Sequence, residues 1–379
     1  MRLKYKAFRA GFKTISRTRA DYWLRSLARG RGVILTFHHV RPEAGFLYER
    51  NRLLEITPSF LDIILAELRN EGFEIISLDA VPFRLREKDT GRPFAVLTFD
   101  DGYRDNVEHA WPVLKRHAAP WTLFVTTDFA SGQGRLWWLE LEKAVIRLDQ
   151  VKVSLNGCSL EMPTRSPEEK RRVFERLFRR LRSGSEEELR ATTARLCTEA
   201  GLLLEELVPK LCLSWDELRS LAREPDVSIG AHTRSHFMLA RHDISTAERE
   251  IFESKSILQN RLGVPIRHFA YPGGDRSCAA AREFEVAGQA GYTTALTTRP
   301  GHLFPHNLKQ LHALPRVSVN GLFQSEAVFR CLLSGVPFLG WTRVSNYFTR
   351  ATAFAVALLS FSEAVTSRAM KELLHVVCA

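Results

Sequence analysis

Apolar runs alternate with amphipathic segments along most of the chain. Residues 94–99 form a continuous apolar run, Phe-Ala-Val-Leu-Thr-Phe, which is typical of a strand buried on both faces. Residues 33–37 form a similar β-rich run. Between them, apolar residues from Phe60 to Leu68 recur at spacings of three and four, which predicts a helix. Thr57-Pro58-Ser59 and Gly72 are the expected start and stop signals of this helix.

The same alternation continues to about residue 320. Further strands are predicted at 73–78, 122–126, 227–231, 267–271 and 292–297, and helices near 105–117, 245–262 and 280–290. Strands and helices joined by short connections predict an α/β fold with a parallel sheet wrapped by helices. Seven or so strands over about 290 residues favour a distorted (β/α)7-type, TIM-like barrel.

Three segments depart from this rhythm. Residues 137–215 are rich in charge and helix formers, which predicts a helical insertion beside the mouth of a barrel spanning 32–321. Residues 1–31 form a basic N-terminal arm. Residues 322–379 are expected to form a helical C-terminal extension, whose apolar face is suggested by Phe354, Leu358, Leu359 and Phe361.

The net charge of +11 would suggest a nucleic-acid partner if it were spread over the whole chain, but it is concentrated near the N-terminus. The arm holds ten Lys/Arg and one Asp, the C-terminal extension has a net charge of +2, and the barrel region sums to zero. A polyanion-binding enzyme would carry its basic residues around the cleft, so no nucleic-acid partner is expected. The arm interleaves Phe8, Phe12 and Trp23 with Arg and Lys, which fits nucleic-acid binding, a helix lying on an anionic membrane, or packing on the barrel.

Cysteine usage and the N-terminus bear on the compartment. The six cysteines form no CxxC pair, and scattered thiols fit a reducing environment. The first 31 residues lack the apolar core of a secretory signal, and the apolar stretch 351–361 is too short to span a bilayer. The expectation is a soluble cytoplasmic protein, with peripheral membrane contact through the arm as an alternative.

Two carboxylates end the strand at 94–99. Asp100 and Asp101 are followed by Gly102, and the carboxyl ends of barrel strands form the active-site face. Adjacent carboxylates repel each other unless a cation lies nearby. The alternative interpretation is a cap that starts the next helix.

Two histidines follow another predicted strand. His232 and His236 are four residues apart and would reach one face if the segment were one helical turn. Imidazole is a favoured ligand of zinc and related ions. One carboxylate and two imidazoles would leave one coordination position of the ion free, as in catalytic sites. A divalent ion lowers the pKa of a bound water from about 15.7 to roughly 7. The other carboxylate can then act as a base on that water. The alternative is two unrelated histidines among twelve.

The segment 269–274, Phe-Ala-Tyr-Pro-Gly-Gly, also ends a strand. Its Pro-Gly-Gly fixes a tight turn, and the N–H of Tyr271 is a candidate donor to a developing oxyanion. A plain turn is the alternative. Trp137, Trp138 and Trp215 near the insertion are candidates for stacking on sugar faces or for core packing.

The ordered set Thr-Phe-Asp-Asp, His-Thr-x-x-His and Phe-Ala-Tyr-Pro-Gly-Gly resembles the polysaccharide deacetylase family, carbohydrate esterase family 4, which includes the NodB-like chitooligosaccharide deacetylases. The resemblance spans about residues 33–320. It implies a distorted barrel and metal-dependent hydrolysis of an N-acetyl group, a linear amide, from a glycan containing N-acetylglucosamine. It assigns Asp100 as the catalytic base, and it places Tyr271 in the oxyanion-stabilising motif. The divalent metal, commonly zinc, would be held by Asp101, His232 and His236.

Two features depart from the family pattern. Many members have a late Leu-x-His motif whose histidine protonates the leaving amine, but His312 directly follows Leu311 here. A circularly permuted subset carries that histidine near the N-terminus, which resembles 36–40, Thr-Phe-His-His-Val, and favours His38 as the general acid. A plain loop pair of histidines is the alternative.

The family also supplies an arginine that pairs with the base. Arg267 precedes the third motif and Arg316 ends another predicted strand; Arg316 is preferred, because a guanidinium near Asp100 would favour its charged form. These departures leave open a second hypothesis, a glycan-binding or membrane-associated scaffold on the same fold without activity.

Overall fold

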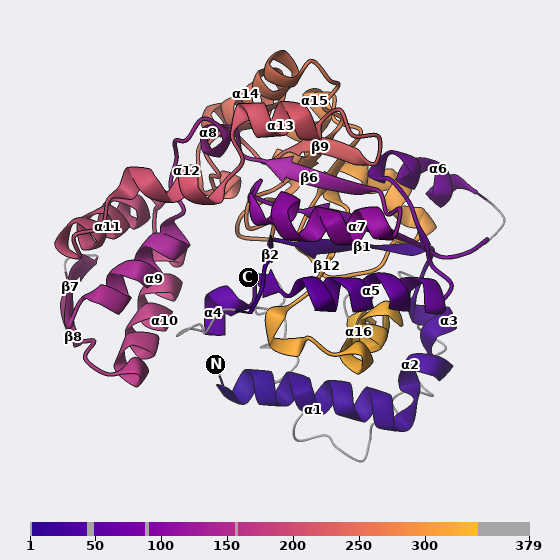
Figure 1. Cartoon of the computed structure of the whole chain (residues 1–379), viewed down its shortest axis with the longest axis horizontal. Coiled ribbons are helices and arrows are strands. Elements are labelled where there is room, and N and C mark those ends of the chain that lie inside the picture. The colour runs from indigo at the N-terminus through magenta and orange to yellow at the C-terminus, as the bar shows by residue number, and fades with distance from the viewer. Residues whose placement is uncertain (1, 44–48, 88–90, 156–157, 340–379) are drawn as a thin grey trace.

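A parallel sheet curled into a barrel forms the centre of the molecule (Figure 1). The computed structural model describes residues 2–43, 49–87, 91–155 and 158–339. The sheet has the strand order β11-β10-β9-β6-β5-β1-β12, and a short strand β4 (Glu74–Ile75) pairs with the start of β5. In chain order its strands are β1 (Gly32–Phe37), β5 (Phe94–Phe99), β6 (Trp121–Val125), β9 (Val227–Ala231), β10 (His268–Ala270), β11 (Thr294–Leu296) and β12 (Val317–Ser318). This architecture confirms the predicted α/β barrel.

The chain around β12 brings the two edges of the sheet together. Leu314 forms a parallel bridge with Leu296 of β11, and its N–H donates to the carbonyl of Ala295. Three residues later, Val317 pairs in parallel with Leu35 of β1. Because one short segment bonds first to the last strand and then to the first, the carboxyl ends of all seven strands surround a common mouth.

Successive side chains of each strand point alternately into the barrel and outwards to the helices, which gives two apolar cores. One set, which includes Ile34, Val96 and Phe124, forms an apolar cluster inside the barrel. The intervening positions, such as Leu35 and Leu97, belong to the larger cluster that packs against the surrounding helices. Both faces of each strand are therefore buried, which explains why the strands read as continuous apolar runs.

Helices cover the outside of the barrel. Their bounds are α5 (Pro58–Asn70), α6 (Val81–Arg86), α7 (Trp111–Arg116), α8 (Thr127–Ala130), α13 (Trp215–Leu221), α14 (Ile244–Leu262) and α15 (Ala281–Gln289), with one π-helical stretch at Asn106–Ala110 before α7. The start of α5 lies where the sequence places it, since the Thr57 hydroxyl accepts a hydrogen bond from the N–H of Phe60.

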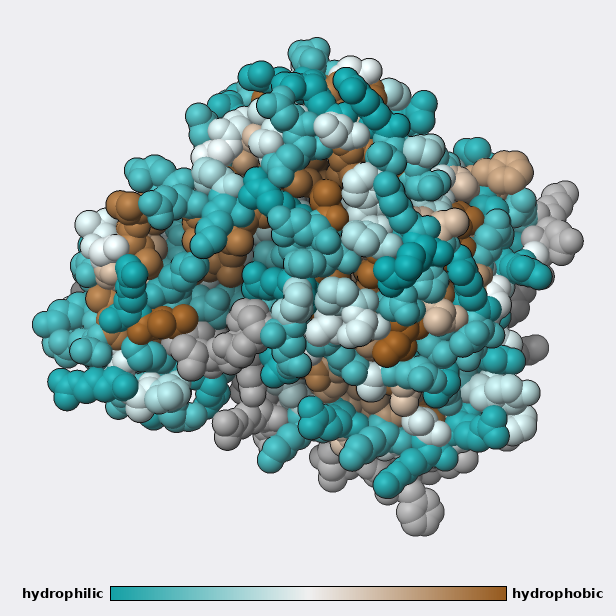
Figure 2. Space-filling model, viewed as in Figure 1, coloured by the Kyte–Doolittle hydropathy of each residue, from teal (hydrophilic) through white to brown (hydrophobic). Residues whose placement is uncertain are grey.

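The segment 137–215 stands beside the barrel with an apolar cluster of its own (Figure 1). It contains α9 (Trp137–Arg147), α10 (Pro167–Ser183), α11 (Glu186–Glu199) and α12 (Leu207–Leu211). The insertion is mainly helical, as predicted, and it also contains an antiparallel pair of strands, β7 (Gln150–Leu155) and β8 (Cys158–Pro163), that the prediction lacked. In the space-filling view, much of this face is hydrophilic, and several groups of apolar side chains show on the left, over the insertion (Figure 2).

The N-terminal arm packs against the region after β12. The arm consists of α1 (Arg2–Thr18), α2 (Ala20–Trp23) and α3 (Arg25–Ala28). Tyr5 and Phe8 are buried and cluster with Phe323, which precedes α16 (Glu326–Leu333). The expected apolar face of the C-terminal extension lies outside the described residues. Within the described part of the chain, no helix combines the length and apolar character needed to cross a bilayer.

Candidate active site

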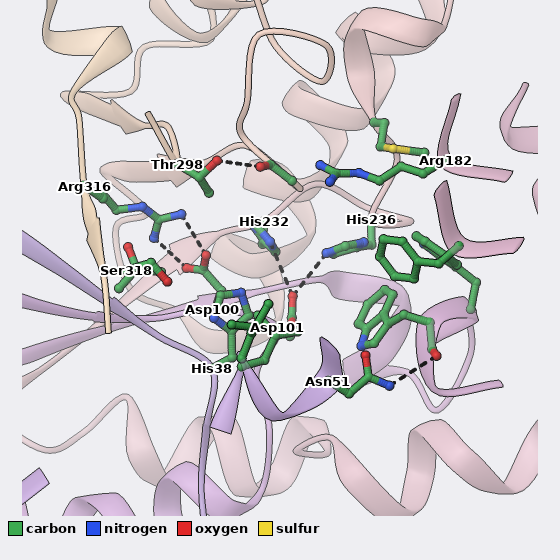
Figure 3. Close-up of a pocket in the computed structure, with 18 residues that line it drawn as sticks. His38, Asn51, Asp100, Asp101, Arg182, His232, His236, Thr298, Arg316 and Ser318 are labelled. Atoms are coloured by element: carbon green, nitrogen blue, oxygen red, sulfur yellow. Dashed lines mark hydrogen bonds and ion pairs between the residues drawn. The ribbon is translucent and has the colours of Figure 1, made fainter. Parts of the chain in front are cut away.

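A pocket opens at the carboxyl ends of the barrel strands and is bounded on one side by the insertion (Figure 3). Polar side chains from five strand ends line it: His38 after β1, Asp100 and Asp101 after β5, His232 and His236 after β9, Thr298 after β11, and Arg316 and Ser318 at β12. Residues from distant parts of the chain therefore meet at the face where β/α-barrel enzymes place their chemistry.

Asp100 forms a bidentate salt bridge with Arg316. The Arg316 Nη1 donates to Oδ1 at 2.8 Å and Nη2 donates to Oδ2 at 2.7 Å. The guanidinium also donates from Nε to the carbonyl of Thr297 and from Nη1 to the hydroxyl of Thr98. Both side chains of the pair are almost completely buried, at 2% and 1% exposed, so the pairing replaces the hydration that each charge lost.

This environment keeps Asp100 ionised. Burial, the largest influence, would raise the pKa of Asp100, but the charge and hydrogen bonds of Arg316, together with the nearby His232 and His38, hold it below the ordinary value. A carboxylate that stays charged at neutral pH in a buried site can accept a proton from a neighbouring group. Arg316 therefore lies where the sequence predicts it. Arg267, the other candidate, is exposed at the start of β10 and pairs with Asp79.

Replacing Arg316 by glutamine is expected to destabilise the fold by about 3–5 kcal/mol at neutral pH, since it leaves a buried carboxylate without its partner. The depressed pKa of Asp100 means that its ionisation stabilises the native state above the pKa of the unfolded chain, and this stability is lost as the pH falls through the native pKa. The native pKa lies below the ordinary value of 3.8, so the wild-type protein keeps this contribution down to about pH 4. In Arg316→Gln, burial acts without its main opposing partner and raises the pKa of Asp100, so the carboxyl of the variant takes up a proton as the pH falls. The loss of stability in Arg316→Gln should therefore shrink in urea titrations as the pH is lowered from 7 towards 4.

Arg267→Gln is the matched control for this measurement. Its side chain is 55% exposed and pairs at 3.5 Å with a half-exposed carboxylate, so its loss should cost less than about 1 kcal/mol. Two results would contradict the assignment of Arg316 as the partner of an ionised Asp100. One is a loss of unfolding free energy in Arg316→Gln no larger than that of the control, and the other is a loss that does not change with pH.

Asp101 faces two imidazoles rather than a guanidinium. Its Oδ1 lies 3.1 Å from Nε2 of His236 and 3.4 Å from Nε2 of His232. Neither contact has hydrogen-bond geometry, and this buried oxygen has no hydrogen-bond partner among the described residues. Burial would raise the pKa of Asp101, but the two histidines hold it well below its ordinary value.

The neighbours of His232 fix which of its nitrogens faces the pocket. Its Nδ1 lies 2.7 Å from the carbonyl oxygen of Ala270, and a carbonyl can only accept, so Nδ1 carries the proton. In the neutral imidazole the lone pair is then on Nε2, the nitrogen that faces Asp101. A histidine oriented in this way by its second nitrogen is typical of metal ligation.

The loop between the two histidines is not a helical turn, which corrects the sequence-based expectation. Thr233 and His236 adopt positive φ angles of 61° and 58°. The carboxylate of Glu250 accepts hydrogen bonds from the N–H groups of Arg234 and Ser235, and the Thr233 hydroxyl accepts one from the N–H of His236. Side-chain acceptors thus fold a short irregular loop so that both imidazoles converge.

Asp101, His232 and His236 fit a divalent cation. One ligand atom from each lies within 4.8 Å of the others. Two ligands at about 2.0–2.2 Å from a tetrahedral ion lie roughly 3.4 Å apart, close to the 3.1 and 3.4 Å separations observed here. Asp101 also has a strained φ of 72°, and its unpartnered buried oxygen is the kind of atom that a cation would satisfy.

His38 lines the same pocket, next to Asp100 (Figure 3). Burial, the largest influence, lowers the pKa of His38, while the charges of Asp101 and Asp100 act in the opposite direction. The neighbouring His39 turns away: its Nδ1 lies 2.6 Å from Asp105 and its ring stacks on Tyr103. Of the adjacent pair, His38 is therefore the one placed for chemistry, although burial disfavours the imidazolium form that was expected.

The structure contradicts the expected oxyanion donor. The N–H of Tyr271 donates to the carbonyl of Leu296 in β11, and its hydroxyl donates to the carbonyl of His312. Tyr271 is fully buried in the apolar cluster outside the barrel and does not line the pocket. From this motif, Gly273 reaches the pocket instead. His312, the poor match to the late histidine motif, bonds through Nε2 to the carbonyl of Tyr292.

Aromatic side chains of the insertion form one wall of the pocket. Trp137 and Trp138 are buried in the insertion's own apolar cluster, which confirms core packing, and they also line the pocket, where stacking on a sugar stays a prediction. Trp138 packs 4.9 Å from the ring of His236. Trp215 lies elsewhere, where its Nε1 donates to the hydroxyl of Ser131.

The sequence analysis assigned no role to five polar residues that line the pocket, namely Thr36, Asn51, Arg182, Thr298 and Ser318. Thr298 lies two residues after β11 and Ser318 is the last residue of β12, so the rule that identified Asp100 would also have pointed to them. Arg182 reaches the pocket from α10 and donates to Asp275 at 2.6 Å. Its position depends on how the insertion docks, and nothing in its charged surroundings marks it in the sequence.

The parallel barrel, the buried carboxylate pair at its mouth and the converging histidines together define a β/α-barrel enzyme with a hydrolytic type of site. A family model described as polysaccharide deacetylase matches residues 87–295, more than half of the chain. The protein therefore belongs to the polysaccharide deacetylase family. The match includes Asp100, Asp101, His232 and His236, whereas His38 and Arg316 lie outside it.

Comparisons with individual proteins gave distant likenesses. The Streptococcus pyogenes deacetylase PplD in complex with acetate is 18% identical, with a TM-score of 0.49 over 76% of this chain and 92% of that chain. IcaB from Ammonifex degensii is 15% identical, with a TM-score of 0.48 over 81% of this chain and 97% of that chain. A search of curated proteins found no match.

Proposed function

We propose that this deacetylase is metal-dependent and removes N-acetyl groups from an oligo- or polysaccharide that contains N-acetylglucosamine. The observation that carries the proposal is the different surroundings of two adjacent carboxylates. Both carboxylate oxygens of Asp100 accept a hydrogen bond from Arg316. In contrast, Asp101 directs an oxygen without a hydrogen-bond partner among the described residues towards two imidazole nitrogens. Two neighbouring carboxylates in such different environments suit two different tasks, a base and a metal ligand.

Asp101, His232 and His236 would hold the metal, and zinc suits a set of one carboxylate and two imidazoles. When bound, such an ion supplies a Lewis acid that polarises a carbonyl and lowers the pKa of water towards neutrality. The protein's own part is to orient the ligands: the Ala270 carbonyl fixes the tautomer of His232, and Trp138 packs on the ring of His236.

Asp100 is the group that would accept the proton of the attacking water. Arg316 keeps this carboxylate ionised and limits its rotation, because both of its oxygens are bonded. His38 lines the pocket near Asp100 and would deliver a proton to the departing nitrogen. Its lowered pKa means that it is mostly neutral in the free enzyme at neutral pH, so the proton that it delivers would first have to reach it, and the proton that Asp100 takes from the attacking water is the one the reaction supplies. No donor role is assigned to Tyr271, because its N–H is already bonded.

The pocket wall supports a sugar as substrate. Trp137 and Trp138 place aromatic surface beside the polar residues of the strand ends. Such a combination suits a sugar ring, which has an apolar face and a polar edge. Asn51, in the short helix α4 (Glu49–Arg52), donates to the carbonyl of Trp138 across 3.4 Å and joins this helix to the wall.

The proposal is tested by incubating the purified protein with N-acetylglucosamine oligomers and measuring free acetate. We expect acetate release that a chelator abolishes and added zinc restores. Asp100→Asn under the same conditions is the control for contaminating activity. Acetate release that is insensitive to chelation would contradict metal dependence. Stoichiometric metal binding without acetate release from any oligomer would favour the inactive scaffold instead.

A further inference from the structure

The N-terminal arm exposes a row of positively charged side chains that form no ion pair with a described residue. The apolar face of α1 is used against the barrel, since Tyr5 and Phe8 are buried in the cluster with Phe323. Positions along the flank of this face follow one another at spacings of three or four residues, so they form one stripe along the helix. This cationic stripe consists of Lys6, Arg9, Lys13 and Arg17, all exposed and none in an ion pair with a described residue. The guanidinium of Arg9 lies over the ring of Phe323, 6.0 Å from its centre, so within the described part of the chain Lys6, Lys13 and Arg17 are the members of the stripe that face only solvent.

Four exposed apolar residues follow α1 in the chain, namely Tyr22, Trp23, Leu24 and Leu27, and they are called the apolar tip below. Tyr22 and Trp23 in α2 are 47% and 71% exposed, Leu24 between the two helices is 39% exposed, and Leu27 in α3 is 58% exposed. The other exposed large apolar side chains of the described residues are scattered singly over the molecule, as is normal for a protein surface. Four of them within six residues form a patch, which marks an interaction site.

The tip carries cations as well as apolar groups. The guanidinium groups of Arg19 and Arg25 lie over the ring of Tyr22, at 5.3 and 4.6 Å from its centre. Tyr22 and Trp23 are the two residue types that concentrate at membrane–water interfaces. The 31-residue arm holds a net charge of +9, whereas the barrel region is neutral. Anionic surfaces are therefore attracted to the arm specifically.

We propose that the arm docks the protein on an anionic lipid membrane, with the tip of Tyr22, Trp23, Leu24 and Leu27 inserted among the headgroups and the cationic stripe lying above them. Lasting membrane attachment generally needs two signals, and here an apolar tip and a basic stripe lie end to end. A nucleic acid would use the charges but would leave the apolar tip in water. The proposal differs from a helix lying on the membrane by its own apolar face, because that face of α1 is buried against the barrel. It does not depend on the proposed catalytic function.

The test measures co-sedimentation of the full-length protein with vesicles of phosphatidylcholine alone or with 30% phosphatidylglycerol. We expect binding only to the anionic vesicles and a decrease at high salt. Neutralising Lys13 and Arg17 with glutamine should weaken binding by about 25-fold, roughly fivefold for each charge. Trp23→Ser combined with Leu27→Ser should weaken it to a similar or greater extent.

Matched controls separate the tip from general effects of substitution. Phe83 in α6 is 64% exposed and Leu203 is 64% exposed, so Phe83→Ser combined with Leu203→Ser should leave binding unchanged. Arg179→Gln combined with Arg180→Gln in α10 is the equivalent control for charge. All these variants should release acetate from soluble oligomers at the wild-type rate, which keeps a failure here distinct from a failure of the proposed function. Binding that survives loss of the tip but not of the stripe would overturn membrane insertion in favour of a general polyanion site.

A second measurement identifies the inserting residue. Brominated lipids quench tryptophan fluorescence only at close range, so anionic brominated vesicles should quench part of the wild-type emission. Trp23→Phe should bind nearly as well and lose this quenching. Quenching that persists in Trp23→Phe and disappears in Trp341→Phe would assign the membrane contact to the C-terminal segment and overturn the proposal, as would the absence of any binding to anionic vesicles.

Discussion

Asp100→Asn is expected to keep the metal and to lose about 10²–10⁴-fold in kcat, the range that a positioned general base contributes. Asparagine preserves the shape of the side chain and one acceptor oxygen for Arg316, but it cannot take a proton from water. The loss should appear in kcat rather than in KM. It is measured by acetate release alongside metal content by atomic absorption, with thermal unfolding to show that the variant is folded.

Asp79→Asn provides the comparison for this substitution. Asp79 pairs with Arg267 and His268 at the starts of the strands, the end of the barrel opposite the pocket. The same chemical change there should leave kcat within about twofold, since a surface ion pair contributes little. If Asp100→Asn instead lost the metal, the roles of Asp100 and Asp101 would be reversed.

Asp101→Ala should abolish metal binding and activity together. It removes the charged member of a three-ligand set and leaves two imidazoles facing a buried gap. Loss even of an outer-shell partner of a metal ligand typically costs 10–100-fold in affinity, so loss of a ligand should exceed about 100-fold. The activity should fall to that of the chelated wild-type enzyme.

Titration calorimetry with zinc checks the binding half of this prediction. High zinc concentrations should restore part of the activity if affinity is the only defect, which a loss of folding would not allow. His236→Ala should behave in the same direction. An Asp101→Ala variant that binds zinc with wild-type affinity would contradict the ligand assignment.

The barrel could be predicted from the sequence because its strands are buried on both faces. The run Phe94–Phe99 matches β5 residue for residue, and Val227–Ala231 matches β9. The residues that follow such runs had to lie at one mouth, because parallel strands share the direction of their carboxyl ends. That rule alone brings Asp100, Asp101 and His232 together, without knowledge of any long-range contact.

Features that depend on tertiary partners were missed. His236 reaches Asp101 because the loop that ends in it contains two residues with positive φ angles and is held by hydrogen bonds to Glu250, which follows 14 residues later in the sequence. The N–H of Tyr271 is bonded by a carbonyl of β11, and no local pattern shows that it is already occupied. The β7–β8 pair had a local signal, the alternation of Val151 and Val153 before an Asn-Gly pair, but the surrounding charged helix formers obscured it.

The central claim is that Asp101, His232 and His236 hold one metal ion and that Asp100 does not. Anomalous diffraction from crystals grown with zinc tests it most directly. The account predicts one strong peak about 2.0–2.2 Å from the Asp101 carboxylate and from Nε2 of both histidines, with Asp100 still paired to Arg316. A peak coordinated by Asp100, or no peak among these three side chains, would contradict it.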